Sequence, residues 1–247
     1  MLSEIYVVLP SFEPDGKLLA TIDSLIRCGF SHIVLINDGS DMKYDRFFSD
    51  AVSLHPDEII LLRHDQNRGK GAALKTGFRW ILNNRPDAAG SVTVDGDGQL
   101  LAEDAVRCSL NMLKSDCITL GCRDFNDPRV PFRSRAGNKI TVFVFRTLCG
   151  IRLTDTQTGL RALPARYLLA FSVITGNRFE YETNMLLAMK DLHLDFEEVN
   201  ISTVYIDNNN GTHFNTVKDS LRIYRVILSH LFRRSSPEQK IERLTHE

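Results

Sequence analysis

Residues 5–41 read IYVVLPSFEPDGKLLATIDSLIRCGFSHIVLINDGSD. The apolar runs at 5–9 and 32–36 have the length of short buried strands, whereas the segment 17–27 between them repeats its apolar residues with the period of a helix. Strands that are apolar on both faces are typical of a parallel sheet that helices cover on both sides. The stretch therefore predicts a β-α-β unit that ends in the polar turn NDGSD.

The same alternation continues to about residue 121. We expect further elements near residues 43–53 (helix), 58–62 (strand), 70–84 (helix), 91–94 (strand), 103–114 (helix) and 117–121 (strand). Beyond residue 123 the pattern becomes irregular, and no repeat or long linker divides the chain. The prediction is an α/β fold with a mostly parallel sheet flanked by helices, in which ligands bind beyond the carboxyl ends of the strands.

The composition of the 247 residues limits the class of protein. With 43% hydrophobic and 25% charged residues, the chain can bury a core and is neither a disordered tail nor a fibre. Lys plus Arg number 30 and Asp plus Glu number 31, so the overall charge gives no reason to expect nucleic acid as a partner. Locally the balance differs, because residues 123–152 hold seven Lys/Arg and two Asp.

Cysteine usage and the N-terminus bear on the compartment. The five cysteines are an odd number without a CxxC pair, which favours structural free thiols in a reducing environment. The N-terminus does not read as a signal peptide, and no window reaches the roughly 18 apolar residues of a membrane-spanning helix. We therefore expect a cytoplasmic protein, with peripheral attachment to the cytoplasmic face of a membrane as the alternative.

Three polar motifs follow predicted strands. The run DGDGQ at 95–99 places two carboxylates where a hard divalent cation would bridge to a diphosphate, although the same run is ordinary turn chemistry. The run NRGKGAA at 67–73 offers backbone N–H groups and Lys70 to anionic oxygen; it lacks the P-loop spacing, and the alternative is a plain helix start. In the third motif, Asp38 either accepts hydrogen bonds from a nucleoside or caps the next helix.

Eight motifs occur in an order that resembles the family 2 glycosyltransferases of the GT-A fold, over about residues 4–206. They read VVLPSFEPDGKL, INDGSD, NRGKGAALKTGF, VDGDGQ, GCRDF, VPFRSRAGN, DTQTGLRALP and RFEYETNML. The later motifs are similar to the polyprenyl-phosphate branch, which includes dolichol-phosphate mannose synthases and undecaprenyl-phosphate glucosyltransferases. Two positions depart from the family pattern: FE at 12–13 replaces an aromatic-Asn pair, and LLA at 100–102 replaces the His-Pro after the metal-site Gln.

The resemblance implies a nucleotide-diphospho-sugar donor, an inverting displacement, a polyprenyl-phosphate acceptor, and Mg²⁺ or Mn²⁺ as cofactor. It also implies residue roles. The nucleotide site would comprise Pro10, Phe12, Glu13, Asp38, Lys70 and Asp95, and the metal site Asp95, Asp97 and Gln99. Phosphate contacts would come from Arg123 and, on the acceptor side, from Arg133, Arg135, Gln157 and Arg161. The catalytic set would be Asp97, Arg123, Arg133 and Glu182.

Glu180 and Glu182 are the candidate acids of the RFEYETNML motif. Two residues apart on a helix they point to different faces, so only one of them can enter the site, and a solvated helix start is the alternative for both. A phosphate acceptor is already anionic at neutral pH and attacks without a protein base, whereas a hydroxyl acceptor would need one.

The function expected from this resemblance is hexose transfer to a polyprenyl phosphate, with UDP-glucose favoured as donor and GDP-mannose next. The alternatives are a glycosyltransferase acting on a saccharide hydroxyl, a sugar nucleotidyltransferase, and a nucleotide-binding scaffold without turnover.

We place the catalytic domain at residues 1–206 and a connector with an amphipathic helix at 207–247. Residues 218–234 gather apolar side chains on one arc and arginines on another, which suits a membrane surface. Packing of this helix on its own domain, or on the second subunit of a homodimer, is the alternative. The run at 208–211, NNNG, is expected to connect the two parts.

Overall fold

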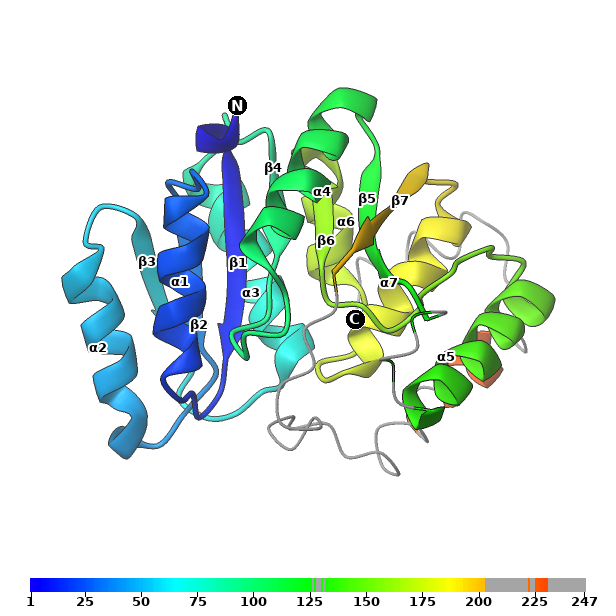
Figure 1. The fold of residues 1–247 in the computed structure, drawn as a ribbon, viewed down its shortest axis with the longest axis horizontal. Coiled ribbons are helices and arrows are strands. Elements are labelled where there is room, and N and C mark those ends of the chain that lie inside the picture. Colours follow the sequence, from blue (N-terminus) through cyan, green and yellow to red (C-terminus); the bar gives the residue numbers. More distant parts are fainter. Residues whose placement is uncertain (126, 128–129, 131, 203–221, 223–224, 231–247) are drawn as a thin grey trace.

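The computed structural model describes residues 1–125, 127, 130, 132–202, 222 and 225–230, and Figure 1 shows one sheet between two layers of helices. The seven strands lie in the order β3-β2-β1-β4-β6-β5-β7. Their bounds are β1 (Ile5–Ser11), β2 (Ile33–Asn37), β3 (Ile59–Arg63), β4 (Gly90–Thr93), β5 (Ile118–Arg123), β6 (Arg161–Pro164) and β7 (Phe196–Ile201). The expected fold class, a mostly parallel sheet flanked by helices, is confirmed.

The helices are α1 (Lys17–Arg27), α2 (Asp45–Leu54), α3 (Lys70–Asn84), α4 (Ala102–Ser115), α5 (Phe132–Val144), α6 (Ala165–Val173) and α7 (Glu180–Asp191). Short 3₁₀ turns occupy Leu2–Glu4 and Met42–Tyr44, and a π-helical turn, η3 (Phe145–Cys149), continues α5. The expected helices at 17–27 and 70–84 are confirmed residue for residue, and the other elements expected before residue 123 differ at their ends by one or two residues.

Alternating side chains of each strand divide the core in two. Ile5, Val7 and Leu9 of β1 pack in the cluster that contains the buried faces of α1, α2 and α4. Tyr6 and Val8 pack in the opposite cluster, with α3, α6 and α7. This two-residue alternation, with both faces covered, explains why the strands are apolar throughout.

Strand β6 is the exception to the parallel order. It pairs antiparallel with β4 and with β5, whereas β1, β2, β3 and β4, and also β5 with β7, pair in parallel. Sequence reasoning did not find α5, β6, α6 or β7. The reversal has a consequence for the site: the loop that leads into β6 reaches the same edge of the sheet as the carboxyl ends of β1, β2, β4 and β5.

The C-terminal part is described only at residues 222 and 225–230. Ile227 is 1% exposed and belongs to the core cluster of α3, α6 and α7, while Leu228 is 51% exposed. This short segment therefore packs on its own domain, as one of the two alternatives expected; the connector at 208–211 and the rest of 218–234 lie outside the described residues.

All five cysteines are free thiols, and four of them are buried, as expected for structural residues. Burial raises the pKa of Cys108 to about 12, which leaves little reactive thiolate at neutral pH. No helix within the described part of the chain has the length and apolar character needed to cross a membrane.

Candidate active site

Polar loops meet at the edge of the sheet that lies lowest in Figure 1, where β1, β2 and β4 end. Because β6 runs against its neighbours, the loop at 155–160 arrives at this edge as well. The loops after β1, β2 and β4 and the loop at 155–160, which are far apart in the sequence, thus lie together at one edge of the sheet. This is the edge at which open α/β sheets bind ligands.

Lys70, the first residue of α3, is the centre of a buried charge cluster. Its Nζ lies 2.8 and 3.0 Å from the two carboxylate oxygens of Asp95 and 3.1 Å from Glu182 Oε1. Burial by itself lowers the pKa of Lys70, but the charges of Asp95 and Glu182 outweigh it and hold the pKa above its ordinary value. Lys70 is therefore a fixed cation that joins α3, the loop after β4 and α7.

The loop before β6 closes against this cluster at Gly159. A Cβ at this position would lie 2.5 Å from Asp95 Oδ2 and 2.9 Å from Lys70 Nζ, so the close approach requires glycine. The hydroxyl of Thr93 donates to the Gly159 carbonyl at 2.5 Å and accepts from the Arg161 N–H at 3.2 Å. These two bonds fix the loop to the end of β4.

Asp38 organises the loop that precedes α3. Its Oδ1 accepts from His64 Nδ1 at 2.7 Å and from the Arg68 N–H at 3.0 Å, and its Oδ2 accepts from the Gly69 N–H at 2.8 Å. His64 Nε2 is in turn 2.9 Å from Thr76 Oγ1. Asp38 thus sets the position at which α3 begins, and it does not cap α2; its contact with a nucleoside remains a prediction.

The first loop is tied to the same region. Pro10, Phe12 and Glu13 are all partly buried, beside or within the end of β1. Glu13 has a left-handed φ of 48°, and its N–H donates to Ser40 Oγ at 2.8 Å, which joins this loop to the turn after β2. The three residues expected for the nucleoside pocket therefore lie beside Asp38, and their contact with a base stays a prediction.

The DGDGQ loop supplies the candidate metal ligands. The Gln99 N–H donates to Asp97 Oδ1 at 3.0 Å. Burial, followed by the negative charge of Asp95, raises the pKa of Asp97, which is the situation that a bound cation relieves. Carboxylate and amide oxygens suit Mg²⁺ or Mn²⁺, and the described residues hold no group of three or more His, Cys, Asp or Glu placed for a metal. The types of donor therefore fit a divalent cation, and its binding by Asp95, Asp97 and Gln99 stays a prediction.

The arginines expected to face phosphate lie on the other side of the loop before β6. Arg123 forms a bidentate pair with the buried Asp155, with Nε–Oδ2 at 2.7 Å and Nη2–Oδ1 at 3.1 Å. Arg135 donates from Nη2 to the Asp127 carbonyl at 2.9 Å, and its buried Nε has no partner among the residues that the structure describes. The backbone of Arg133 lies in α5, but its side chain lies outside the described set.

Two further acceptor-side candidates differ in accessibility. Gln157 is exposed at the tip of the loop before β6, and its N–H donates to Asp155 Oδ1 at 2.9 Å. Arg161 is 1% exposed, and its guanidinium donates to the carbonyls of Glu182 at 2.8 Å and Thr158 at 3.4 Å. Arg161 braces α7 against this loop, so its expected phosphate contact remains a prediction.

The two glutamates of α7 occupy different surroundings. Glu182 takes part in the Lys70 cluster. Glu180 Oε1 instead accepts from the N–H groups of Asn177 and Arg178, at 3.1 and 3.2 Å, and closes the turn before the helix. The geometry thus brings one glutamate to the site, and a catalytic role for Glu182 remains a prediction.

Sequence reasoning assigned no individual role to His64, Thr93, Asp155 or Gly159, although Asp155 and Gly159 belong to the motif DTQTGLRALP that carried the resemblance. His64 directly follows β3, at the edge of the sheet where ligand loops were expected, and that position was the available signal. Thr93 and Asp155 form partnerships with residues 32 or more positions away, which no local pattern reveals.

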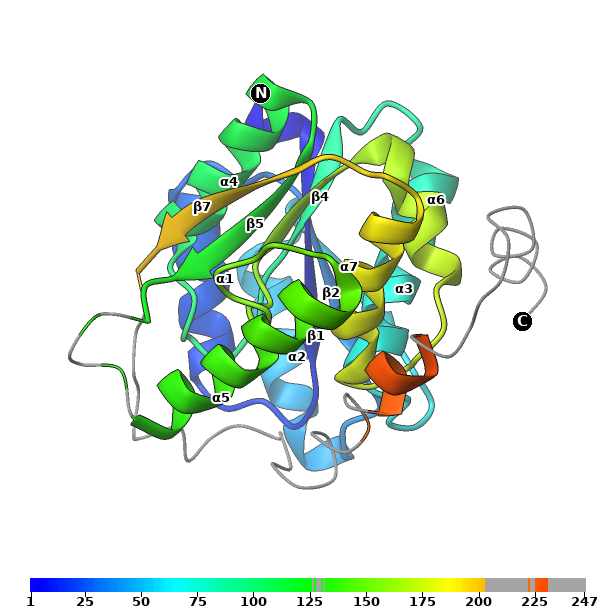
Figure 2. The same cartoon turned by 90° about the vertical axis from the view of Figure 1, so that its right-hand side faces the viewer.

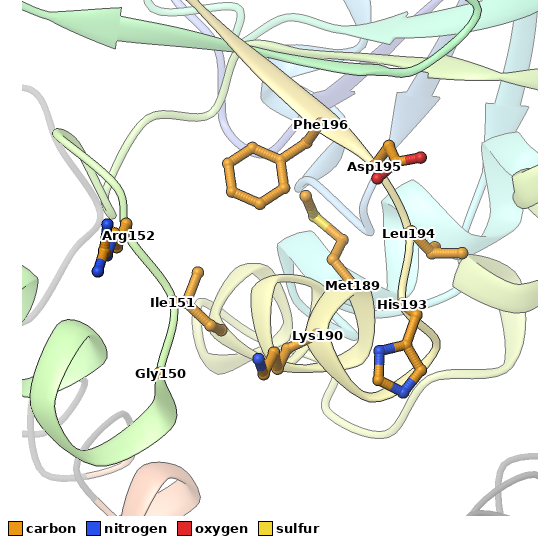
Figure 3. A pocket seen from close by; sticks show the side chains of 9 residues that line it. All are labelled: Gly150, Ile151, Arg152, Met189, Lys190, His193, Leu194, Asp195 and Phe196. Carbon is orange, nitrogen blue, oxygen red and sulfur yellow. The ribbon is translucent and has the colours of Figure 1, made fainter.

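Two cavities lie away from the polar cluster. The larger, about 380 Å³, opens between the end of η3, the end of α7 and the start of β7 (Figure 3). The other, about 280 Å³, lies beside α5 and η3. Arg152 lines both, and none of the expected site residues lines either. The motif residues therefore define the candidate site more directly than cavity size does.

Comparison with known proteins agrees with this geometry. The family described as "Glycosyl transferase family 2" matches residues 6–157. The chain is 24% identical over 240 residues to a UDP-N-acetylglucosamine–dolichyl-phosphate N-acetylglucosaminyltransferase of Methanococcus voltae, covering 91% of this chain and 95% of the relative. It is 25% identical over 249 residues to a dolichyl-phosphate beta-glucosyltransferase of Dictyostelium discoideum, covering 90% and 74% of the two chains.

Among solved structures, mannosyl-3-phosphoglycerate synthase from Rubrobacter xylanophilus superposes with a TM-score of 0.66 at 13% identity, covering 98% of this chain and 76% of that one. At this level of identity the likeness concerns the fold alone, and it agrees with the GT-A architecture expected from the motifs.

Proposed function

The chain belongs to glycosyl transferase family 2, and from this premise we propose that it transfers a hexose from a nucleotide-diphospho-sugar to a polyprenyl phosphate. The observation that carries the proposal is the similarity, along nearly the whole chain, to transferases whose names give dolichyl phosphate as the acceptor. The division of the site supports it, because carboxylates with Lys70 lie on one side of the loop before β6 and guanidinium groups lie on the other.

In the proposed reaction, an oxygen of the acceptor phosphate attacks the anomeric carbon while the bond to the nucleoside diphosphate breaks and the leaving oxygen keeps the electron pair. Asp95, Asp97 and Gln99 would hold a divalent cation, which when bound supplies Lewis-acid stabilisation of the diphosphate. Arg123 and Arg135 would orient the acceptor phosphate, with Arg133 as a third cation. Inversion at the anomeric carbon follows from a single displacement.

Glu182 has a positioning task in this scheme. Its carboxylate is 3.1 Å from Lys70 Nζ, so it holds the lysine beside Asp95. The acceptor phosphate carries its own negative charge and needs no protein base, because its second pKa is about 6. A hydroxyl acceptor would need a base, and Glu182 is engaged in an ion pair with Lys70, which favours the phosphate.

The donor is proposed to be UDP-glucose, with UDP-N-acetylglucosamine suggested by the name of the Methanococcus relative and GDP-mannose next. The test is a panel of labelled UDP- and GDP-sugars with a polyprenyl phosphate, run with Mg²⁺, with Mn²⁺ and with EDTA. Transfer of a label to the lipid in a metal-dependent manner supports the proposal. Transfer only to a saccharide hydroxyl, or formation of a sugar nucleotide, would replace it with one of the other enzyme classes.

The acceptor assignment has its own test in Arg133→Ala and Arg135→Ala. Each removes a charged donor, and we expect the KM for the lipid phosphate to rise about tenfold while the KM for the donor changes little. Lys114→Ala, an exposed cation at the far end of α4, is the control. Unchanged lipid-phosphate kinetics in both arginine variants would show that the acceptor lies elsewhere.

A further inference from the structure

The outer face of α5 and η3 exposes large apolar side chains. Ile140 is 55% exposed, Phe143 66% and Leu148 51%. Figure 2 shows α5 on the outside of the molecule, facing the viewer. Lys139 and Arg146, which are also exposed, lie on the same stretch. We call these five residues the α5 surface.

The segment that carries the α5 surface has charges of one sign, and the acidic Glu198 of β7 lies at its edge, in the cavity that Arg146 and Arg152 also line. Residues 132–154 contain five Lys/Arg and no Asp or Glu. Isolated exposed apolar residues are ordinary, but a group of them within a purely cationic segment matches the interface of an anionic bilayer, where apolar groups enter the acyl region and cations meet lipid phosphates. A symmetric contact with a second copy of this chain would instead oppose like charges.

Hydrogen bonds connect helix α5, which carries the α5 surface, to the candidate active site. Asn138 of α5 donates from Nδ2 to the Thr154 carbonyl at 2.8 Å and accepts from the Thr156 N–H at 3.3 Å. The residue between these two, Asp155, is the partner of Arg123. A partner that docks on α5 therefore lies close to the arginines that are proposed to bind the acceptor phosphate.

From the exposed apolar group, the single sign of charge and the link through Asn138, we propose that the α5 surface docks on the anionic face of a lipid bilayer. Ile140, Phe143 and Leu148 enter the headgroup–acyl boundary, and Lys139 and Arg146 contact lipid phosphates. The inference rests on the proposed function only in assuming that the acceptor is a membrane lipid; the docking itself can be measured without turnover.

The test is flotation of the full chain with phosphatidylcholine vesicles and with vesicles containing phosphatidylglycerol. We expect binding to the anionic vesicles that weakens with salt, and an affinity at least about tenfold lower for the double variant Ile140→Glu/Phe143→Glu, since burial of each side chain contributes to partitioning. The control is Leu169→Glu on α6, because Leu169 is 64% exposed but lies in a different helix. Equal binding of the double variant and the wild type, or no binding by the wild type, would overturn the docking.

Two further measurements separate the possible failures. Light scattering reports the mass in solution, and a wild-type dimer that the double variant abolishes would assign the α5 surface to a second copy and overturn the proposal. Transfer is also assayed with a short, water-soluble polyprenyl phosphate and with a long-chain acceptor in vesicles. Docking predicts that the double variant loses activity only on the vesicles. Loss of neither activity contradicts the docking, whereas absence of transfer to both acceptors in the wild type contradicts the proposed function.

Discussion

The two sides of the candidate site differ in how completely their charged groups are paired. On the donor side, which comprises Asp38, Lys70, Asp95 and Glu182, both carboxylate oxygens of Asp38 accept protein hydrogen bonds and Lys70 contacts two carboxylates. On the acceptor side, which comprises Arg123 and Arg135, one guanidinium is paired with Asp155 and the other keeps a buried Nε with no partner among the described residues.

This difference indicates two modes of binding. A region whose hydrogen bonds are already made is preorganised, so a ligand meets fixed charges and little reorganisation is needed. A buried N–H group without a partner carries a desolvation penalty that an incoming acceptor oxygen would remove. We therefore expect substitutions on the donor side to act by displacing groups that are already positioned, and substitutions on the acceptor side to act by removing direct contacts with the ligand.

The largest effect is expected for Asp97→Asn, which keeps the size of the side chain and removes a charge from the proposed metal site. The turnover number should fall about a thousandfold, because the developing charge on the diphosphate loses its counter-charge. Asp87→Asn, in the exposed loop before β4, is the matched control. If Asp97→Asn changed only the KM for the acceptor, the proposed separation of a donor side from an acceptor side would be wrong.

The loop before β6, which lies between the donor side and the acceptor side, is tested by Gly159→Ala. The new methyl group would overlap Asp95 Oδ2, so the carboxylate or the loop must move, and a displacement of about 1 Å is expected to reduce kcat/KM about a hundredfold. Gly137→Ala, in α5, is the control, since a Cβ there meets nothing within 4 Å and alanine favours the helix. Equal activity of the two variants would show that the 155–161 loop does not position Asp95.

The smallest effect is expected for His64→Ala, which sharpens the comparison because it acts on the donor side alone. Asp38 loses one of its three hydrogen bonds, so the start of α3 is held less firmly and the donor KM should rise about tenfold with little change in kcat. His64→Asn, which retains a donor group, should recover part of the loss. A change in the acceptor KM, measured in the same assay, would contradict a separate donor side.

How much the sequence predicted differs between the two parts of the fold. Before residue 123, apolar runs alternate with helical periodicity, and α3 was found with its bounds. After that point, β6 is four residues long and antiparallel. Helix α5 lies in the basic segment, for which no helix was predicted. A short strand has too few positions to establish a period, and its direction depends on neighbours that are distant in the chain.

The candidate site shows the same limit at the level of side chains. The motif DGDGQ and the family resemblance selected Asp95 and Asp97 as candidate metal ligands, which stays a prediction, and only one glutamate of the pair in α7 was expected to enter the site. The sequence assigned Arg123 and Arg161 to phosphate, yet in the structure one is paired with Asp155 and the other is buried against two carbonyls. Residue type indicates what a side chain can bind, whereas its actual partner depends on which segments the fold brings together.

By itself, the sequence determined the period and polarity of each segment, and with them the two-faced sheet, its helical layers and the loops that carry charge. Only the tertiary structure decided that Lys70 meets Asp95, 25 positions away, and that the antiparallel β6 brings Gly159 against both. The physical reason is that periodicity is a local property of consecutive side chains, whereas contacts between distant segments form only when the packing of the whole core offsets the entropy of closing the loops between them.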